Sequence, residues 1–411
     1  MLKSNGLLRI LQFIHVRKIK LIRYLISIFA ASYVSALLIV FYAWFALTGT
    51  EGGSVETVGH VLALRSVINL AFGPFLGVII DRIGPRLAGS IGCLLISIGS
   101  IIILNNVSGI KTTEFVLIIS ALFTSSGVAI FSPSLDAILQ TTAVNASKGA
   151  GVRNFGRQGG MIVGSGLTGI LLASGYGELT IYTVILVMIG QLLYMVTASK
   201  SPPAGVKNKT FFLKELGAGI KMLWDPVGAQ LVILFSASLA LGQLTNSLLA
   251  GLIVEKSFSA VSYGLSDASW SVGAIVIAGL LSFYVPKSPM FIARIVLLVA
   301  SLAFVLMPIW PNPLLLCCAH FILGGLYSGV RTIVDGMLLD YVPVGYMGRV
   351  KSNVSAVSGF VGVLVYLSPS ILGFPLASTY YVFDGILLIA ICLFTILKYR
   401  NHLALAPTSK A

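Results

Sequence analysis

Charged side chains are scarce in this sequence. Asp, Glu, Lys and Arg together make up only 10% of the 411 residues, whereas hydrophobic residues make up 57%. Soluble globular domains carry about 25% charged residues, so this composition excludes a soluble domain. The chain instead has the composition of a protein with many membrane-spanning segments.

Cysteine is also rare, and all four cysteines lie in apolar runs: Cys93, Cys317, Cys318 and Cys392. Their placement excludes an extracellular disulfide framework, and we interpret them as small core residues. The sequence also lacks a nucleotide-binding loop, a metal-ligand cluster and a plausible Ser, His and Asp set. It therefore predicts no enzyme activity, no metal and no cofactor, so an ion gradient or the substrate's own gradient must supply the energy.

Acidic residues are few compared with basic ones, 13 against 27, and the formal net charge is +14. In a soluble protein this excess would suggest nucleic acid, but here the positions of the charges indicate topology. When the apolar runs are threaded across a bilayer, every Lys and Arg except Lys111, Lys256, Arg65 and Arg331 falls on one side. This asymmetry predicts a bacterial cytoplasmic membrane protein with both termini in the cytoplasm and no nucleic-acid partner.

Twelve apolar runs are long enough to cross a membrane core of about 30 Å, which takes about 20 residues. They lie at approximately 22–47, 58–80, 86–105, 115–140, 150–174, 179–197, 226–253, 261–285, 289–309, 314–339, 350–373 and 377–398. They predict an all-α polytopic membrane protein with twelve transmembrane helices. Residues 1–20 are basic with apolar residues at helical spacing, which predicts a helix along the inner membrane surface or an irregular tail.

The longest connection divides the chain into two halves. We predict an N-terminal six-helix bundle at 1–198, a cytoplasmic linker at 199–225 and a C-terminal six-helix bundle at 226–411. Within the linker, apolar residues recur at helical spacing from Phe211 to Leu223, which predicts a short amphipathic helix on the membrane surface.

Short matches between the halves indicate an internal repeat. Ser126-Gly127-Val128 in the fourth run recurs as Ser328-Gly329-Val330 in the tenth, which is the corresponding run of the second half. Repeats of this kind are common in transporter folds. We therefore expect two pseudo-symmetric bundles.

A charged turn between the second and third runs reads Gly77-x-x-x-Asp81-Arg82-x-Gly84-x-Arg86. Gly77 allows close helix packing, Gly84 allows a tight turn, and Asp81 with the two arginines marks where a helix leaves the bilayer. The residue types, spacing and position resemble the signature of the major facilitator superfamily, where it joins helices 2 and 3.

The resemblance extends over essentially the whole chain. Three stretches resemble its drug-efflux branch, which contains macrolide-efflux-like proteins and siderophore exporters: 131–137, 212–219, and 326–330 followed by Gly348-Arg349-Val350. This implies a monomeric, secondary-active antiporter that exports a small amphipathic molecule, a drug-like compound or a siderophore, by alternating access and in exchange for protons. The alternatives are an uptake carrier, a lipid flippase, or a non-transporting membrane receptor or scaffold.

The fifth predicted helix, at 150–174, has two features that bear on packing and on transport. Gly156, Gly160 and Gly164 recur every four residues and predict a smooth face for close packing against another helix. The stretch Gly164-Ser165-Gly166 stands where the superfamily's antiporter signature expects a Gly-Pro pair, which leaves drug and proton exchange open.

Charged residues toward the inner side are predicted to form a gate that switches between conformations. A charge at bilayer depth costs at least about 2.5–3.5 kcal/mol, so such residues are functional candidates. Arg331 and Asp335 share a helix face and form either a local structural pair or part of this gate. The resemblance implies that Asp81 lies near Arg349. The gate candidates are Gly77, Asp81, Arg82, Gly84, Arg86, Asp136, Arg331, Asp335 and Arg349.

Titratable residues in the outer halves of the helices are candidates for proton coupling: Asp267, His320 and Asp384. His320 either relays protons, binds substrate or has a structural role. Arg65 either binds an anionic substrate or pairs with Asp267 or Asp384. Polar and aromatic residues on the predicted cavity helices suit an amphipathic ligand. The substrate candidates are Tyr33, Tyr42, Arg65, Ser125, Ser126, Gln243, Asn246, His320 and Tyr327.

Overall fold

The computed structural model describes residues 2–107, 112–142, 146–198, 225–283, 288–341 and 347–399, and this part of the chain is helical. The first six helices are α1 (Leu2–Thr48), α2 (Val55–Ile83), α3 (Pro85–Val107), α4 (Glu114–Thr142), α5 (Ala146–Ala173) and α6 (Gly177–Thr197). The others are α8 (Pro226–Glu255), α9 (Ala260–Phe283), α10 (Pro289–Val305), η1 (Met307–Ile309), α11 (Pro313–Tyr341), α12 (Met347–Leu372) and α13 (Ala377–Lys398). The predicted linker helix at 211–223 lies outside the described residues.

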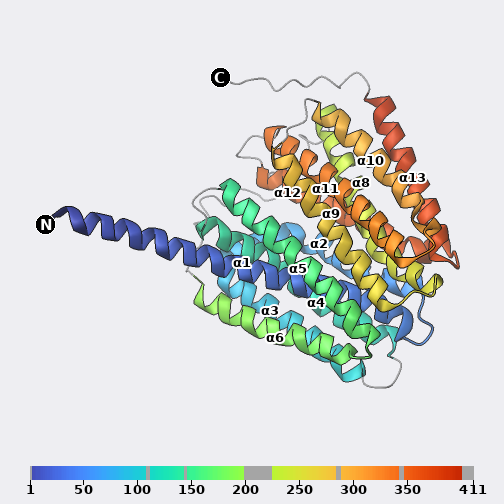
Figure 1. Ribbon diagram of the computed structural model, residues 1–411, viewed down its shortest axis with the longest axis horizontal. Coiled ribbons are helices and arrows are strands. Elements are labelled where there is room, and N and C mark those ends of the chain that lie inside the picture. Colours follow the sequence, from blue (N-terminus) through green and yellow to red (C-terminus); the bar gives the residue numbers. More distant parts are fainter. Residues whose placement is uncertain are drawn as a thin grey trace.

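The helices form two groups, which we call the N-half (α1–α6) and the C-half (α8–α13) (Figure 1). Within the N-half, α1 packs on α5 and α3 on α4, and within the C-half, α9 packs on α11. The halves meet mainly through two helix pairs, α2 with α12 and α5 with α9. We call the ends joined by the α1–α2, α5–α6, α8–α9 and α12–α13 connections the outer side, as the charge distribution predicts.

Ten of the described helices have an apolar stretch that is long enough to cross a membrane. The other two of the predicted twelve are α5 and α12. In α12 the apolar part is shorter, Ala356–Leu372. In α5, Arg153, Arg157 and several glycines lower the hydropathy of the first half. Both helices lie where the halves meet, and neighbouring helices there shield polar side chains from lipid.

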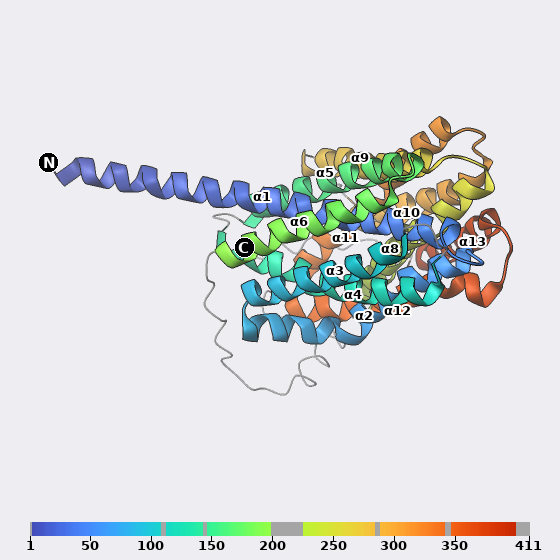
Figure 2. The ribbon, with the colours of Figure 1, turned by 90° about the horizontal axis from the view of Figure 1, so that it is seen from below.

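The α1 helix continues without a break from Leu2 to Thr48. The expected surface helix at residues 1–20 is therefore not a separate element lying across the bundle. It extends α1 along the same axis and projects beyond the other helices (Figures 1 and 2).

The predicted glycine face of α5 packs directly on the backbone of α1. A Cβ atom at Gly160 would lie 2.8 Å from the backbone nitrogen of Tyr33, and one at Gly164 would lie 3.1 Å from the Tyr33 Cα. At Gly156 a Cβ would lie 3.0 Å from Leu25 Cδ1. The absence of side chains at these three positions therefore allows the two helices to touch.

Candidate functional site

Both helix pairs that join the halves are in backbone contact. In the α5–α9 pair, a Cβ at Gly169 would lie 2.9 Å from the Cα of Gly264. In the α2–α12 pair, a Cβ at Gly59 would meet the backbone carbonyl of Tyr366, and one at Gly359 would lie 3.1 Å from the backbone nitrogen of Leu70. We call these two contacts the glycine seams. They provide close, smooth interfaces between the halves.

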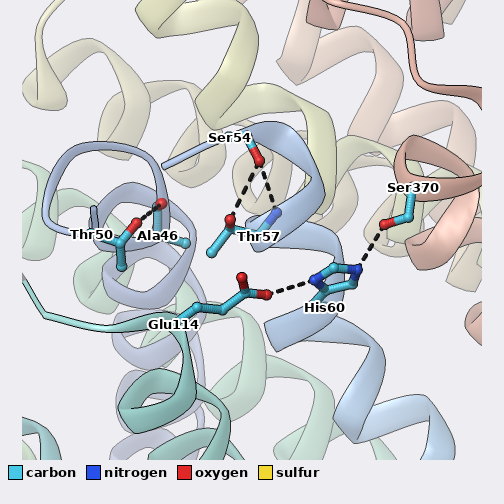
Figure 3. Close-up of polar contacts among 7 residues, drawn as sticks. All are labelled: Ala46, Thr50, Ser54, Thr57, His60, Glu114 and Ser370. Carbon is cyan, nitrogen blue, oxygen red and sulfur yellow. Dashed lines mark hydrogen bonds and ion pairs between the residues drawn. The ribbon is translucent and has the colours of Figure 1, made fainter. Parts of the chain in front are cut away.

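A polar chain crosses between the halves on the outer side, and Figure 3 shows its members. The Nδ1 atom of His60 on α2 lies 2.6 Å from a carboxylate oxygen of Glu114 on α4. The Nε2 atom of the same ring lies 2.7 Å from the hydroxyl of Ser370 on α12. We call these three residues the outer clasp. Nearby, the rings of Trp44 on α1 and Tyr263 on α9 stack 6.1 Å apart, which adds a second contact between the halves.

The sequence did not single out His60 as a candidate because it lies only a short distance into its helix. Histidine near a helix end is ordinary in a membrane protein, and no local pattern connects it to Glu114 or Ser370. Only the packing of α2 between α4 and α12 brings the three side chains together.

Asp267 lies in the α5–α9 seam and accepts a hydrogen bond from the hydroxyl of Ser165 on α5. This contact joins the halves about 12 Å before the outer end of α5 at Ala173, from a rise of 1.5 Å per residue. Ser165 belongs to the stretch where the sequence departs from the Gly-Pro signature. The serine hydroxyl thus supplies a polar contact that proline could not make.

The other two proton-coupling candidates lie inside the C-half. Asp384 on α13 is buried, and the hydroxyl of Ser368 on α12 lies 3.5 Å from one of its carboxylate oxygens. His320 on α11 is fully buried, its Nδ1 lies 3.0 Å from the carbonyl of Leu316, and its Nε2 has no partner in the described part of the chain. Of the three candidates, only Asp267 has a hydrogen bond that crosses between the halves among the described residues.

Arg65 on α2 does not form an ion pair with Asp267 or Asp384 in the described structure. Its side chain is half-buried, and it interacts electrostatically with Tyr366 on α12 and Arg157 on α5. The expected pairing of Arg65 with Asp267 or Asp384 is therefore not formed among the described residues, and its role in binding an anionic substrate stays a prediction.

Arg157 of α5 is exposed, and its electrostatic interactions involve residues of both halves. It interacts electrostatically with Arg65 on α2 and with Tyr327 and Arg331 on α11. We call Arg65, Arg157, Arg331 and Tyr327 the central cluster. Sequence reasoning placed Arg157 only among the charges of the inner side, because nothing in the sequence shows that its helix face points toward the C-half.

Polar groups of the predicted substrate site lie beside this cluster. Gln243 on α8 and Ser66 on α2 converge on Gly362 of α12, where a Cβ would meet both side chains. Asn246, one helical turn from Gln243, lies close to the side chain of Tyr366 on α12. Ligands that need hydrogen-bond partners and an apolar surface suit such a mixture.

Tyr327 forms an aromatic contact with Trp270 of α9, with ring centroids 5.1 Å apart, and its ring also packs against Gly242 of α8. The structure therefore brings Tyr327 together with Gln243, Asn246 and Arg65, three other residues of the predicted substrate site.

Four other predicted substrate residues, Tyr33, Tyr42, Ser125 and Ser126, lie within the N-half, whereas His320 lies on α11 of the C-half. The hydroxyl of Tyr33 donates to Thr183 of α6 over 3.4 Å. The hydroxyl of Tyr42 lies 2.7 Å from that of Ser120 on α4. Ser125 and Ser126 are half-buried on α4. The two tyrosines satisfy their hydroxyl groups inside the N-half, as packing residues do.

The predicted inner gate contains pairs that lie within one half. Arg153 donates from Nη2 to Oδ2 of Asp136 over 2.6 Å, so Asp136 pairs with α5. Arg331 lies 4.0 Å from Asp335, and its guanidinium stacks 4.0 Å above the Phe235 ring. A partly exposed pair at this distance contributes little stability, typically about 0.2–1 kcal/mol.

The charged turn joins α2 to α3 through Gly84 alone, which has φ +85°. This left-handed conformation explains the glycine. Arg82 is exposed, and Arg86 donates from Nε to the carbonyl of Met195 on α6 over 3.1 Å. The side chains of Asp81 and Arg349 lie outside the described part of the structure, as does the environment of Gly77, so the expected Asp81 contact stays a prediction.

The family of the chain follows from comparison with known proteins. The model of the Major Facilitator Superfamily matches residues 24–373, so the chain belongs to this superfamily. No curated protein sequence matches it. This membership, together with the helical fold, makes the chain an integral membrane transporter of the superfamily type and not an enzyme.

Solved structures share the fold. The crystal structure of a single-residue mutant of the nucleoside transporter NupG has a TM-score of 0.74 at 12% identity and covers 92% of this chain and 100% of its own. The crystal structure of NupG itself has a TM-score of 0.67 at 14% identity, and the match covers 93% of this chain and 99% of the NupG chain. At these identities the likeness shows the fold alone.

Proposed function

We propose that this transporter exports a small amphipathic molecule by alternating access, as the resemblance to the drug-efflux branch implies, and that inward proton flow drives the export. The observation that carries the proposal is the distribution of contacts between the halves. The outer clasp, the Trp44–Tyr263 stack and the Ser165–Asp267 hydrogen bond join the halves on the outer side. The central cluster lies deeper and keeps exposed surface at Arg157.

These contacts support a state that is closed toward the outside. In such a state an exporter would load its substrate from the cytoplasm. Export then requires the outer contacts to break while the inner ends of the halves approach each other. The glycine seams support such a movement, since smooth helix faces can shift against one another.

Asp267 is the proposed coupling residue. Its carboxyl group lies in a seam that must rearrange during the cycle, so its hydrogen bond to Ser165 and its access to water change together. A group that changes protonation as it faces alternate sides can exchange a proton for substrate. His320 and Asp384 have no such position among the described contacts and remain secondary candidates.

Membrane vesicles of defined orientation test the proposal. We expect everted vesicles containing the protein to accumulate a fluorescent amphipathic dye when their lumen is acidic, and right-side-out vesicles to exclude it. Accumulation in the opposite orientation would identify an uptake carrier. Movement of a fluorescent phospholipid alone would identify a flippase, and ligand binding without any movement would identify a receptor or scaffold.

A further inference from the structure

The proposed export cycle does not explain why α5 directs the positively charged side chain of Arg157 toward the interior of the protein. The residues of α5 that face away from the bundle are Phe155, Val163 and Ile170, which are 66%, 45% and 48% exposed. At about 100° per residue, all three lie within about 60° of the direction opposite Arg157. The guanidinium of Arg157 therefore points away from the lipid and toward the interior, where the N-half faces the C-half.

Two positive charges in this region have no acidic partner in the described part of the chain. Arg153 pairs with Asp136, and Arg331 lies near Asp335, but Arg65 and Arg157 have no carboxylate within ion-pair distance among the described residues. Arg157 also interacts unfavourably with Arg65, Arg153 and Arg331. Grouping like charges at membrane depth is costly unless something negative joins them.

Candidate carboxylates are present but are directed elsewhere. Asp267 accepts its hydrogen bond from Ser165 in the seam, and Asp384 lies close to Ser368 inside the C-half. If Arg65 and Arg157 served only for packing, Asp267 or Asp384 could neutralise their charges. Among the described residues, neither Asp267 nor Asp384 pairs with Arg65 or Arg157, which leaves these two positive charges available to a ligand.

The surroundings of the two arginines match the body of an organic ligand. Trp270 and Tyr327 provide an aromatic surface, and Gln243 provides an amide. From the helix rise, Arg65 lies about 15 Å from the outer end of α2 and Arg157 about 24 Å from the outer end of α5, so both arginines lie within the depth of a core of about 30 Å.

We propose that the transported molecule is an organic anion whose carboxylate or phosphate group binds between Arg65 and Arg157 while its apolar part lies against Tyr327 and Trp270. Planar guanidinium groups bind both acidic groups with paired hydrogen bonds. This inference rests on the proposed transport function and narrows it, because it excludes the cationic compounds that an amphipathic-drug exporter could also carry.

Pairs of probes that share an apolar body, one with an acidic group and one neutral, test this inference on the purified full-length protein in detergent. The probes are 1-naphthoate with 1-naphthamide, indole-3-acetate with indole-3-acetamide, decanoate with decanamide, and 2-naphthyl phosphate with 2-naphthol. Calorimetric titration is expected to show at least tenfold tighter binding of the acid in one or more pairs. Equal binding of acid and neutral partner in every pair would overturn the inference.

Variants then locate the anion. Arg157→Gln and Arg65→Gln are each expected to weaken binding of the preferred acid at least tenfold while its neutral partner binds as before. Arg157→Lys should restore part of the preference, since it restores the charge. Arg23→Gln is the matched control, because Arg23 is exposed and donates to Thr197 far from the cluster. An unchanged acid preference in both glutamine variants would contradict the proposed site.

Vesicle transport of the same probes separates this inference from the proposed function. If an acid binds through Arg157 but is never moved, the transport proposal fails and the anion site stands. If neutral partners are moved as well as acids, and Arg157→Gln leaves transport intact, transport stands and the anion site fails.

Discussion

At the scale of single residues, the chemistry depends on which charges are paired. Asp136 is matched by Arg153 and Asp335 lies near Arg331, each inside one half, so these acids can move as part of a rigid body. Asp267 differs because its partner, Ser165, belongs to the other half. A residue whose only described hydrogen bond crosses a moving interface is suited to sense the conformation of the protein.

Replacing Asp267 by asparagine tests the coupling role. The amide can still accept a hydrogen bond from Ser165, so the fold and substrate binding should persist, but it cannot exchange a proton. We expect proton-driven accumulation of the dye in everted vesicles to fall at least tenfold, while binding of the dye changes less than threefold.

Asp384→Asn is the matched control, since Asp384 lies inside the C-half, and we expect it to retain accumulation. Vesicles carrying Asp267→Asn that still concentrate the dye under a pH gradient would remove Asp267 from the coupling mechanism.

At the scale of elements, glycine positions decide how closely helices approach. The four-residue spacing on α5 allowed the sequence to predict a packing face, and the structure confirms it by placing Gly160 on the backbone of Tyr33. The seams between the halves could not be predicted in the same way. Gly59, Gly169 and Gly264 lie in three separate helices, Gly169 falls outside the four-residue spacing on α5, and no local pattern indicates which helix each one meets.

A pair of alanine substitutions on α5 tests this packing. A Cβ at Gly160 would overlap the backbone of α1, so Gly160→Ala should destabilise the protein by about 1–3 kcal/mol, as overpacking typically does. At Gly166 a Cβ would meet nothing within 4 Å, so Gly166→Ala should leave the Tm unchanged or raise it. Thermal unfolding in detergent measures both, and equal Tm values for the two variants would contradict the packing described.

The same contrast applies to the candidate site. Hydropathy and the charged-turn signature predicted twelve helices and the superfamily, because each helix must carry its own apolar run. Polar groups inside apolar runs are conspicuous in a sequence, so Arg65, Gln243, Asn246 and Tyr327 could be named as candidates, and their substrate role stays a prediction. The neighbours of Arg157 and the partners of His60 lie on helices far away in the chain, so the sequence did not indicate them. It also did not indicate that the hydroxyl groups of Tyr33 and Tyr42 have partners inside the N-half.

At the scale of the whole molecule, the described contacts between the two halves are the glycine seams and a set of side-chain contacts on the outer side. The outer clasp is one of these contacts, because His60 connects Glu114 of the N-half with Ser370 of the C-half. If export requires the outer side to open, fixing this contact covalently must stop the cycle.

Cysteine pairs test this requirement in a background without the four native cysteines. We expect His60→Cys with Ser370→Cys to lose transport when treated with a short bifunctional thiol reagent, and to regain it on reduction. The pair His60→Cys with Glu114→Cys is the matched control, because it also removes His60 but joins two helices of the same half. Transport that continues through a complete His60–Ser370 crosslink would show that the outer side does not open there.

The glycine seams bear on how the transport rate responds to cooling. Interfaces built from interdigitating side chains must lift ridges out of grooves before they slide, and this repacking carries a large activation enthalpy. In the seams, backbone lies against backbone at Gly169 and Gly264, so few such ridges stand in the way. If the halves shift along these seams during transport, we expect the polar contacts at the outer side, the clasp among them, to contribute more to the activation enthalpy than the seams do.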